Sequence, residues 1–380
     1  MESRESELIA DLREHFGSLE DPRSGQGRLH LFIDIIGISL LAVICGAEGF
    51  TEIEEYALSK QDFLQKHFQL PNGIPSHDTF GRVLSRLDSE CFEDYFTHWF
   101  TGICNNFDDV ISIDGKKLRH SYDTKEDTEA IWLVSAWSNA YNLVLAQQKV
   151  SEKSNEITAI PKLLEGLDVE GALLTIDAMG TQKSIASLII KKGGDYLLAL
   201  KGNQGNLHQE VQEAFGTFTA KATSLFDEQK DSGHGRVETR CCWVAKAEDW
   251  LLPATIAEWK ELKSIICVES HIYYKNGKNE GKHHRETRYY ICSLVPDAER
   301  INNSIRKHWG VETKLHWVLD VAFGEDDSRV RKGNAPENLS ILRRIALNKL
   351  KAESSVKKGI KVKRKKAGWD EDYLVKVLMA

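Results

Sequence analysis

The sequence predicts an α/β protein in which an all-helical N-terminal segment precedes a mixed-sheet core with a β-rich insertion. Three observations support this class. Apolar residues follow a helical period over about the first 105 residues, strand-length apolar runs then alternate with helical segments, and several strand-like runs follow one another at 205–300. The composition, with 41% hydrophobic and 28% charged residues among 380, is that of a globular protein and excludes wholesale disorder.

The N-terminal segment carries two strong helical signals. Ile9, Leu12 and Phe16 have the spacing of one helix face, and an apolar run from Leu31 to Ala47 follows. This run is shorter than the ~20 residues that span a bilayer and it contains Asp34, so we expect a buried core helix and no membrane partner. The acidic, amphipathic start of the chain is unlike a signal peptide.

Another helix is expected after the turn at 70–75, with Ser76 or Asp78 as its N-cap. Its inner face would consist of Phe80, Val83, Leu84 and Leu87. Arg82 and Arg86 lie along another side, where they could place this helix on DNA. A plain helical bundle has the same pattern, so both interpretations stay open.

The elements that follow have the order β-β-β-α-β-α-β. The expected strands are 110–114, 131–137, 143–150, 172–177 and 195–200, and the expected helices are 157–167 and 181–190. The insertion has strands at 237–244, 264–274 and 286–292, and helices return at 302–321 and 338–351. We therefore expect a helical domain at 1–105, the first part of the core at 106–204, the insertion at 205–300, a helical completion of the core at 301–351 and a basic C-terminal arm at 352–380.

Charge is distributed unevenly along the chain. The net charge is −7, but residues 343–366 contain eleven Lys or Arg and one acid, Glu353, so this segment holds +10 and the remainder −17. Its most basic stretch is Lys363, Arg364, Lys365 and Lys366. Such asymmetry predicts a basic arm that binds DNA, and the alternative is a tail that only aids solubility.

The seven cysteines are scattered and form no Cys-x-x-Cys pair. A structural zinc site is therefore not expected, and a reduced, cytoplasmic protein fits this usage best.

Two strand-like runs end in the same way. The runs 111–114 and 174–177 each place one acid, Asp114 or Asp177, at the end of an apolar strand, where α/β folds hold their sites. In this order the fourth strand commonly lies beside the first, so the two carboxylates would repel each other unless a cation neutralised them. Oxygen ligands favour Mg²⁺ or Mn²⁺. The alternative is that each Asp merely begins a turn or caps a helix.

A third acid is expected from the helix at 302–321. His308, Glu312, His316 and Asp320 are spaced by four residues and would line one face. This stripe could form the wall of a metal and phosphate site. The His-x3-His spacing also permits a zinc pair, and a solvated polar stripe is the remaining alternative.

Seven short motifs are spread over nearly the whole chain. They are Leu19–Arg23, Ile113–Lys116, Thr175–Met179, Leu200–Gln204, His308–Glu312, His316–Val321 and Glu325–Arg329. Together they resemble the motifs of bacterial insertion-sequence transposases of the DDE type, in the branch that includes H-repeat-associated proteins. Each motif is weak alone, and the combination is specific.

The resemblance implies an RNase H-like catalytic core in which Asp114, Asp177 and Glu312 form a triad that binds two divalent metal ions, Mg²⁺ or Mn²⁺. It implies double-stranded DNA as the partner, both transposon ends and target, and a homo-oligomer on paired ends. It also implies a cytoplasmic, nucleoid-associated protein.

Related transposases carry a Tyr-Arg-Glu-Lys signature around the glutamate, and this chain has Ile305, His308 and Leu319 at the other three positions. Because the Arg and Lys of the signature are absent, neighbouring cations would then contact the DNA phosphate in their place. The expected DNA contacts of the core are Lys116, Lys201, Arg306, Lys307, His308 and Lys314.

The predicted function is DNA transposition: binding of terminal inverted repeats, metal-dependent strand cleavage, and attack of the released 3′-hydroxyl on target DNA. Another RNase H-like nuclease, such as a junction resolvase, would cut without joining. A non-catalytic or decayed protein derived from such an enzyme would bind inverted repeats whether or not Asp177 was present.

Overall fold

The computed structural model describes residues 7–25, 28–101, 109–122, 129–150, 155–233, 235–277 and 280–380. The chain divides into two compact units. The first comprises Met1–Asn105, Gly115–Ser154 and Glu312–Ala380, and the second comprises Asn106–Asp114 and Asn155–Val311. The predicted boundary at 105/106 lies outside the described residues, and the five-part division of the chain stays a prediction.

Helices make up most of the first unit. The N-terminal ones are α1 (Glu7–Phe16), α2 (Phe32–Cys45), α3 (Phe50–Ser59), α4 (Gln61–His67), α5 (His77–Arg86) and α6 (Ser89–Thr101). The C-terminal ones are α13 (Trp317–Phe323), α14 (Ala335–Ala352), α15 (Ile360–Trp369) and α16 (Glu371–Leu378). The predicted helical N-terminal region is thus confirmed.

The apolar run at 31–47 forms α2, a core helix that is buried from Asp34 to Ile44. Asp34 is tolerated there because its carboxylate accepts a hydrogen bond from the Leu70 backbone N–H at 3.1 Å. α14 packs against α2 and is buried from Ala335 to Leu350. Among the described residues, no single helix is long and apolar enough to cross a membrane, although α2 and α3, which are bent by 92°, pass the length and composition test as a pair.

Three neighbouring parallel strands form the centre of the sheet. β1 (Val110–Lys117) pairs with β4 (Leu173–Ile176), and β4 pairs with β5 (Asp195–Leu200). β4 is buried along its whole length, as its continuous apolar sequence predicts. α7 (Glu156–Glu165) precedes β4, and α8 (Lys183–Lys191) is the crossover that parallel neighbours such as β4 and β5 require.

β2 (Trp132–Ser138) and β3 (Leu143–Lys149) form the predicted antiparallel hairpin. The strand order of the sheet is β3-β2-β1-β4-β5-β9-β8-β7-β6. The fourth strand therefore lies beside the first, as predicted, and the first five strands have the mixed order of an RNase H-like core.

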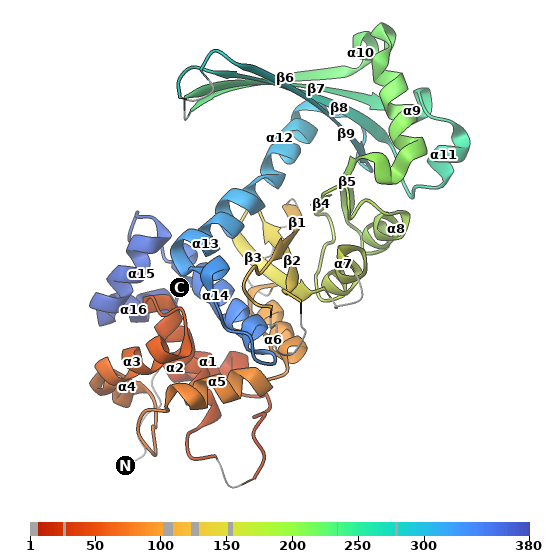
Figure 1. The fold of residues 1–380 in the computed structure, drawn as a ribbon. Coiled ribbons are helices and arrows are strands. Elements are labelled where there is room, and N and C mark those ends of the chain that lie inside the picture. Colours follow the sequence, from red (N-terminus) through yellow and green to blue (C-terminus); the bar gives the residue numbers. More distant parts are fainter. Residues whose placement is uncertain are drawn as a thin grey trace. The chain divides into compact units, whose positions relative to one another are not determined.

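The insertion continues the sheet as an antiparallel ribbon (Figure 1). Its strands are β6 (Leu225–Gly233), β7 (Arg236–Lys246), β8 (Ser264–Tyr274) and β9 (His283–Cys292), and its helices are α9 (Gly205–Gly216), α10 (Phe218–Thr223) and α11 (Pro253–Ala257). Neither β6 nor α9 follows from the sequence pattern. β6 is the last strand of the sheet and none of its residues is buried, so it lacks the alternation of apolar side chains that marks a strand.

The predicted helix at 302–321 is not continuous. α12 (Ala298–His308) is capped at Trp309, and a π-helical segment, Glu312–His316, precedes α13. A π turn holds more residues than an α turn, so the side chains that follow it are rotated relative to a regular helix. The expectation of a single four-residue polar stripe is therefore corrected.

The C-terminal segment that was predicted as a basic arm contains the helices α15 and α16. α16 buries Tyr373, Leu374, Val377 and Leu378. Within α15, Lys363 and Arg364 are buried. A run of cationic residues does not by itself indicate exposure, because long cationic side chains can be buried when backbone carbonyls accept their hydrogen bonds.

Candidate active site

Two neighbouring parallel strands carry the predicted Asp pair at the same edge. The register of β1 with β4 ends at the pair Ile113 and Ile176. Asp114 comes next within β1, which continues to Lys117 beyond its predicted end, and Asp177 comes directly after β4. The two isoleucines are only 1% and 3% exposed, so burial of these apolar side chains fixes where each acid emerges from the core. Adjacent strands lie about 4.8 Å apart, which makes the two backbones neighbours at this edge.

Asp177 is held by its own loop. Its Oδ1 accepts hydrogen bonds from the backbone N–H groups of Met179 at 3.0 Å and Gly180 at 3.2 Å. Asp177 thus also begins a turn, as the alternative interpretation proposed. Within the described part of the chain, the Asp177 Oδ2 accepts no hydrogen bond, and one carboxylate oxygen remains for a ligand.

His308, at the end of α12, contacts the strand that carries Asp177. Its Nδ1 lies 3.0 Å from Thr175 Oγ1, which lies 3.1 Å from Ser112 Oγ on β1. Burial lowers the pKa of His308, and the Asp177 carboxylate opposes this shift only in part. At pH 7 this side chain therefore supplies a hydrogen bond and not the positive charge of an arginine.

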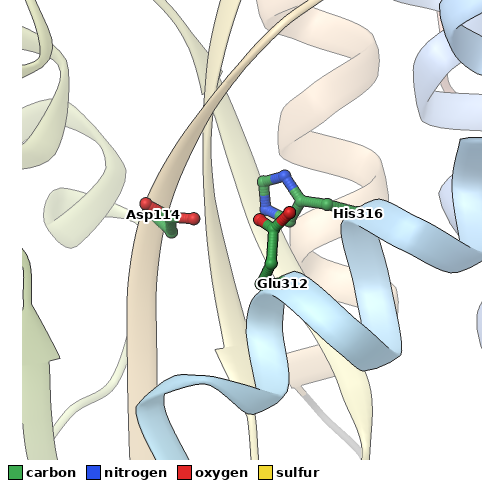
Figure 2. A group of neighbouring side chains, drawn as sticks. All are labelled: Asp114, Glu312 and His316. Carbon is green, nitrogen blue, oxygen red and sulfur yellow. The ribbon is translucent and has the colours of Figure 1, made fainter. Parts of the chain in front are cut away.

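Glu312 and His316 come from the π-helical segment and form, with Asp114, a group that could hold a metal ion (Figure 2). One ligand atom of each residue lies within 4.8 Å of those of the other two. Glu312 is exposed, whereas His316 is 4% exposed. Single π turns are frequent at functional sites.

The protonation state of His316 suits a metal ligand. Burial lowers the pKa of its imidazole to about 3, and the positive charges of Lys116 and Arg344 contribute. The ring is therefore neutral at pH 7, which is the form that binds metal. Asp177 is not a member of the group of Asp114, Glu312 and His316.

Lys116 is buried and paired with acids, so the predicted DNA contact at this residue is corrected. Its side chain is 8% exposed, and its Nζ forms an ion pair with Asp320. The same Nζ lies 3.3 Å from Glu325 Oε2 and 3.7 Å from Asp326 Oδ1. A cation in the core needs such partners, and the three acids supply them here.

Glu325 is the buried centre of this network. Its Oε1 accepts hydrogen bonds from Arg344 Nη1 at 2.9 Å and from Ser340 Oγ at 3.0 Å. Burial alone would raise the pKa of Glu325, but Arg344 and Lys116 outweigh this effect and lower the pKa to about 2. The network joins β1, α13 and α14 and so fixes the helix that follows the π-helical segment.

The roles of Glu325 and Arg344 were missed at the level of sequence. Arg344 contributes to the basic run and Glu325 to a motif, and neither pattern indicates that they meet. One signal was present: Arg343 and Arg344 interrupt an otherwise apolar stretch of helix, and cations there require buried partners.

The remaining predicted DNA contacts differ in exposure. Lys201, Lys307, Lys314 and Lys365 are exposed, as is Arg306, and Lys366 is half-buried. Arg306 forms an ion pair with Asp231, and Lys314 Nζ donates to Asn142 Oδ1 at 2.9 Å. These cations stay predicted DNA contacts.

Lys363 and Arg364 bind helix ends, so their assignment to DNA is corrected. Lys363 Nζ donates to the Leu350 carbonyl at 2.8 Å, and Arg364 Nη2 donates to the Val43 carbonyl at 2.7 Å. Arg364 Nη1 also donates to the Ala322 carbonyl. All three acceptors lie in the last turns of helices, whose carbonyls lack partners within the helix and attract cations.

Two family models match the chain. The model described as Transposase DDE domain matches residues 105–349, and the model described as DDE_Tnp_1-associated matches residues 13–100. The protein belongs to the DDE transposase family.

Curated relatives place it near H-repeat-associated proteins, as the motifs suggested. "H repeat-associated putative transposase YhhI" of Escherichia coli strain K12 is 42% identical over 97% of this chain and 98% of that protein. "Putative transposase YncI" of Escherichia coli O157:H7 is 43% identical over 97% of this chain and 95% of that protein. A more distant match is the cryo-EM structure of the piggyBac transposase synaptic complex with hairpin DNA, with a TM-score of 0.44 and 11% identity over 99% of this chain and 80% of that one.

Proposed function

We propose that this transposase binds the terminal inverted repeats of its insertion sequence, cleaves DNA strands there with divalent metal ions, and transfers the released 3′ ends to target DNA. The observation that carries the proposal is that Asp114 on β1 and Asp177 directly after β4 each follow the last register pair of these adjacent parallel strands. Glu312, which lies in a group with Asp114, is the third catalytic residue of the proposal.

The donor chemistry fits a divalent cation. Asp114, Glu312 and the neutral His316 would hold one ion, Mg²⁺ or Mn²⁺, and Asp177 would take part in holding a second. The chemistry supplied by bound ions is activation of the attacking oxygen and stabilisation of the leaving oxygen of the phosphodiester.

Other residues of the chain hold these acids in place. The N–H groups of Met179 and Gly180 bind one oxygen of Asp177 and so orient the carboxylate. The hydroxyls of Ser112 and Thr175 link β1 to β4 just before the two Asp residues. Supporting contacts of this kind keep catalytic groups within the narrow tolerances that catalysis requires.

We further propose that double-stranded DNA is bound through the exposed cations Lys201, Arg306, Lys307, Lys314 and Lys365, with Lys366 beside them. Each phosphate that such a cation neutralises adds to the affinity and to its salt dependence. Cleavage at two ends requires a homo-oligomer on paired ends, and we place the reaction on nucleoid DNA in the bacterial cytoplasm.

The test uses the full-length protein and DNA that carries the inverted repeats flanking its gene. With Mg²⁺ or Mn²⁺ we expect strand cleavage at the repeat ends and joining of the 3′ ends to a plasmid target. Scrambled repeats should remain uncut. Chelation with EDTA should stop cleavage and joining while binding in a gel-shift assay persists.

Two outcomes would favour the other functions. Cleavage of branched DNA without any joined product would indicate an RNase H-like nuclease of the resolvase type. Specific binding of the repeats without cleavage in either metal would indicate a non-catalytic or decayed transposase-derived protein.

A further inference from the structure

We propose that a cavity in the N-terminal helical region binds a backbone phosphate of the transposon-end DNA. The polar residues that line this cavity, called the α5 pocket below, are Arg23, Ser24 and His30 and, from α5, Thr79, Arg82 and Arg86. Its volume is about 340 Å³, which corresponds to roughly ten water molecules. The proposal rests on the function proposed above and names one place where the DNA end is held.

One face of α5 supplies half of the pocket. Thr79, Arg82 and Arg86 are three and four residues apart, and such residues lie on the same side of a helix. The helix is anchored from behind by Asn338 on α14, whose Nδ2 donates to the carbonyl of Leu84 at 2.8 Å. The two arginines therefore extend from a fixed backbone.

On the other side of the pocket, Arg23 is engaged by the protein itself. Its guanidinium donates to both carboxylate oxygens of Asp21, at 2.9 and 2.8 Å, and to the His30 carbonyl at 2.8 Å. Arg23 is 9% exposed and lines the pocket. Arg28 Nε also lies 3.7 Å from Asp21 Oδ2, so a single carboxylate faces two guanidinium groups and neutralises the charge of only one of them.

Arg82 and Arg86 supply positive charge to the pocket that no acid of the described residues neutralises. Both are exposed, and Arg82 Nη2 donates to the uncharged Thr79 Oγ1 at 3.2 Å. Within the described part of the chain, the guanidinium group of Arg86 makes no hydrogen bond or ion pair. Two guanidinium groups beside one cavity match the geometry of a phosphate group, to which arginine donates two parallel hydrogen bonds.

His30 lines the pocket with a polar but uncharged side chain. Burial lowers its pKa, and the nearby Arg23 lowers it further, so the imidazole is neutral at pH 7. The mouth of the pocket is open, because Ser24, Arg82 and Arg86 are exposed. Arg28, with its side chain 52% exposed, lies beside this region and favours a ligand with successive phosphates, as in a DNA backbone, over a single free anion.

The test measures binding of the full-length protein to repeat DNA and random DNA as a function of salt. For Arg86→Gln we expect the log-log slope to fall by about 0.9, and for Arg82→Gln with Arg86→Gln by about twice that. In the double variant, the loss of affinity between 50 and 200 mM salt should shrink by roughly tenfold. Both DNAs should be affected alike, since phosphate contacts carry no sequence information.

Three controls accompany these variants. Arg86→Lys keeps the charge and should keep the slope. Lys66→Gln removes an exposed charge from α4, away from the pocket lining, and should leave the slope unchanged. Thermal melting should show that the variants remain folded, as expected for exposed side chains.

The outcomes separate this inference from the proposed function. An unchanged slope in the double variant, with the wild type cleaving repeat ends, overturns the α5 pocket and leaves the transposase reaction standing. A reduced slope with RNA but not with DNA also overturns it. A reduced DNA slope in a protein that never cleaves supports the pocket and contradicts the catalytic proposal, and a wild type that does not bind repeat DNA contradicts both.

Discussion

Asp114 and Asp177 each lie one residue beyond the last register pair of two adjacent parallel strands, Ile113 and Ile176. At the usual strand spacing of about 4.8 Å, two such carboxylates repel each other unless a cation lies between or beside them. This relationship makes metal binding measurable without any DNA. A ligand that binds only the folded state stabilises it.

We therefore expect Mn²⁺ to raise the melting temperature of the wild type, and Asp114→Asn to remove most of this increase. A free Mn²⁺ concentration of 100 times the dissociation constant would stabilise the folded state by about 2.7 kcal/mol. Asp249→Asn, which changes an exposed acid on the insertion, should keep the full metal effect. Equal metal-dependent shifts in all three proteins would show that Asp114 is not a ligand.

The identity of the third acid can be tested by comparing two acids of the first unit. Glu312→Gln should abolish metal-dependent strand cleavage, because Glu312 lies with Asp114 in the group of metal donors. Asp326→Asn should retain cleavage, because Asp326 is paired with Arg119 at 3.2 Å and with Lys116. Glu299→Gln, an exposed acid in the first turn of α12, is the matched control. The reverse pattern would move the third acid to Asp326.

The buried network around Glu325 predicts a large effect on stability. Glu325→Gln leaves Arg344 and Lys116 without their shared negative charge, and breaking a buried ion pair in this way costs about 3 to 5 kcal/mol. Asp327→Asn, which changes an exposed neighbour, should cost less than about 0.5 kcal/mol. Urea unfolding at pH 7 measures both. Equal free energies of unfolding for the two variants would contradict the proposed role of Glu325.

The same carboxylate sets an acid dependence. The pKa of Glu325 is lowered in the folded protein from its ordinary 4.5 to about 2, so its stabilisation is complete above about pH 4.5 and is lost as pH falls towards 2. The difference in the free energy of unfolding between the wild type and Glu325→Gln should therefore become smaller when urea unfolding is measured at pH 3 than when it is measured at pH 5. A constant difference between the two proteins over this range would argue against a lowered pKa.

The C-terminal cations should divide into two classes. Arg364→Ala should destabilise the fold by at least about 2 kcal/mol, because the carbonyls of Val43 and Ala322 lose a charged donor. Lys365→Ala should leave unfolding unchanged and lower the salt slope of DNA binding by about 0.9. Chemical unfolding and salt titration of each variant measure the two effects. An Arg364→Ala protein that is as stable as the wild type but has a reduced salt slope of DNA binding would support the prediction that Arg364 contacts DNA.

The core strands and the Asp pair were predictable because each depends on local sequence. A continuous apolar run such as that of β4 indicates a strand buried on both faces, and a single acid at its end marks the sheet edge. Only the pairing of the fourth strand with the first required knowledge of the usual strand order.

The errors of prediction arise from contacts that are distant in sequence. Lys116 and Arg344 look like available cations until the fold brings them to Glu325. Arg364 looks like part of an arm until helix ends supply its acceptors. The π-helical segment at Glu312–His316 likewise has no signature in the local pattern, since the same residues satisfy the spacing of a regular α-helix.

The measurement that most directly tests the central claim is strand cleavage by Asp177→Asn on DNA with the terminal repeats. The asparagine keeps an acceptor oxygen for the N–H groups of Met179 and Gly180, so the loop should remain intact while the charge is lost. With Mg²⁺ or Mn²⁺, the wild type should cut and join the ends, and the variant should bind the same DNA within about twofold and produce no cleavage. Cleavage by the variant at the rate of the wild type would contradict the account.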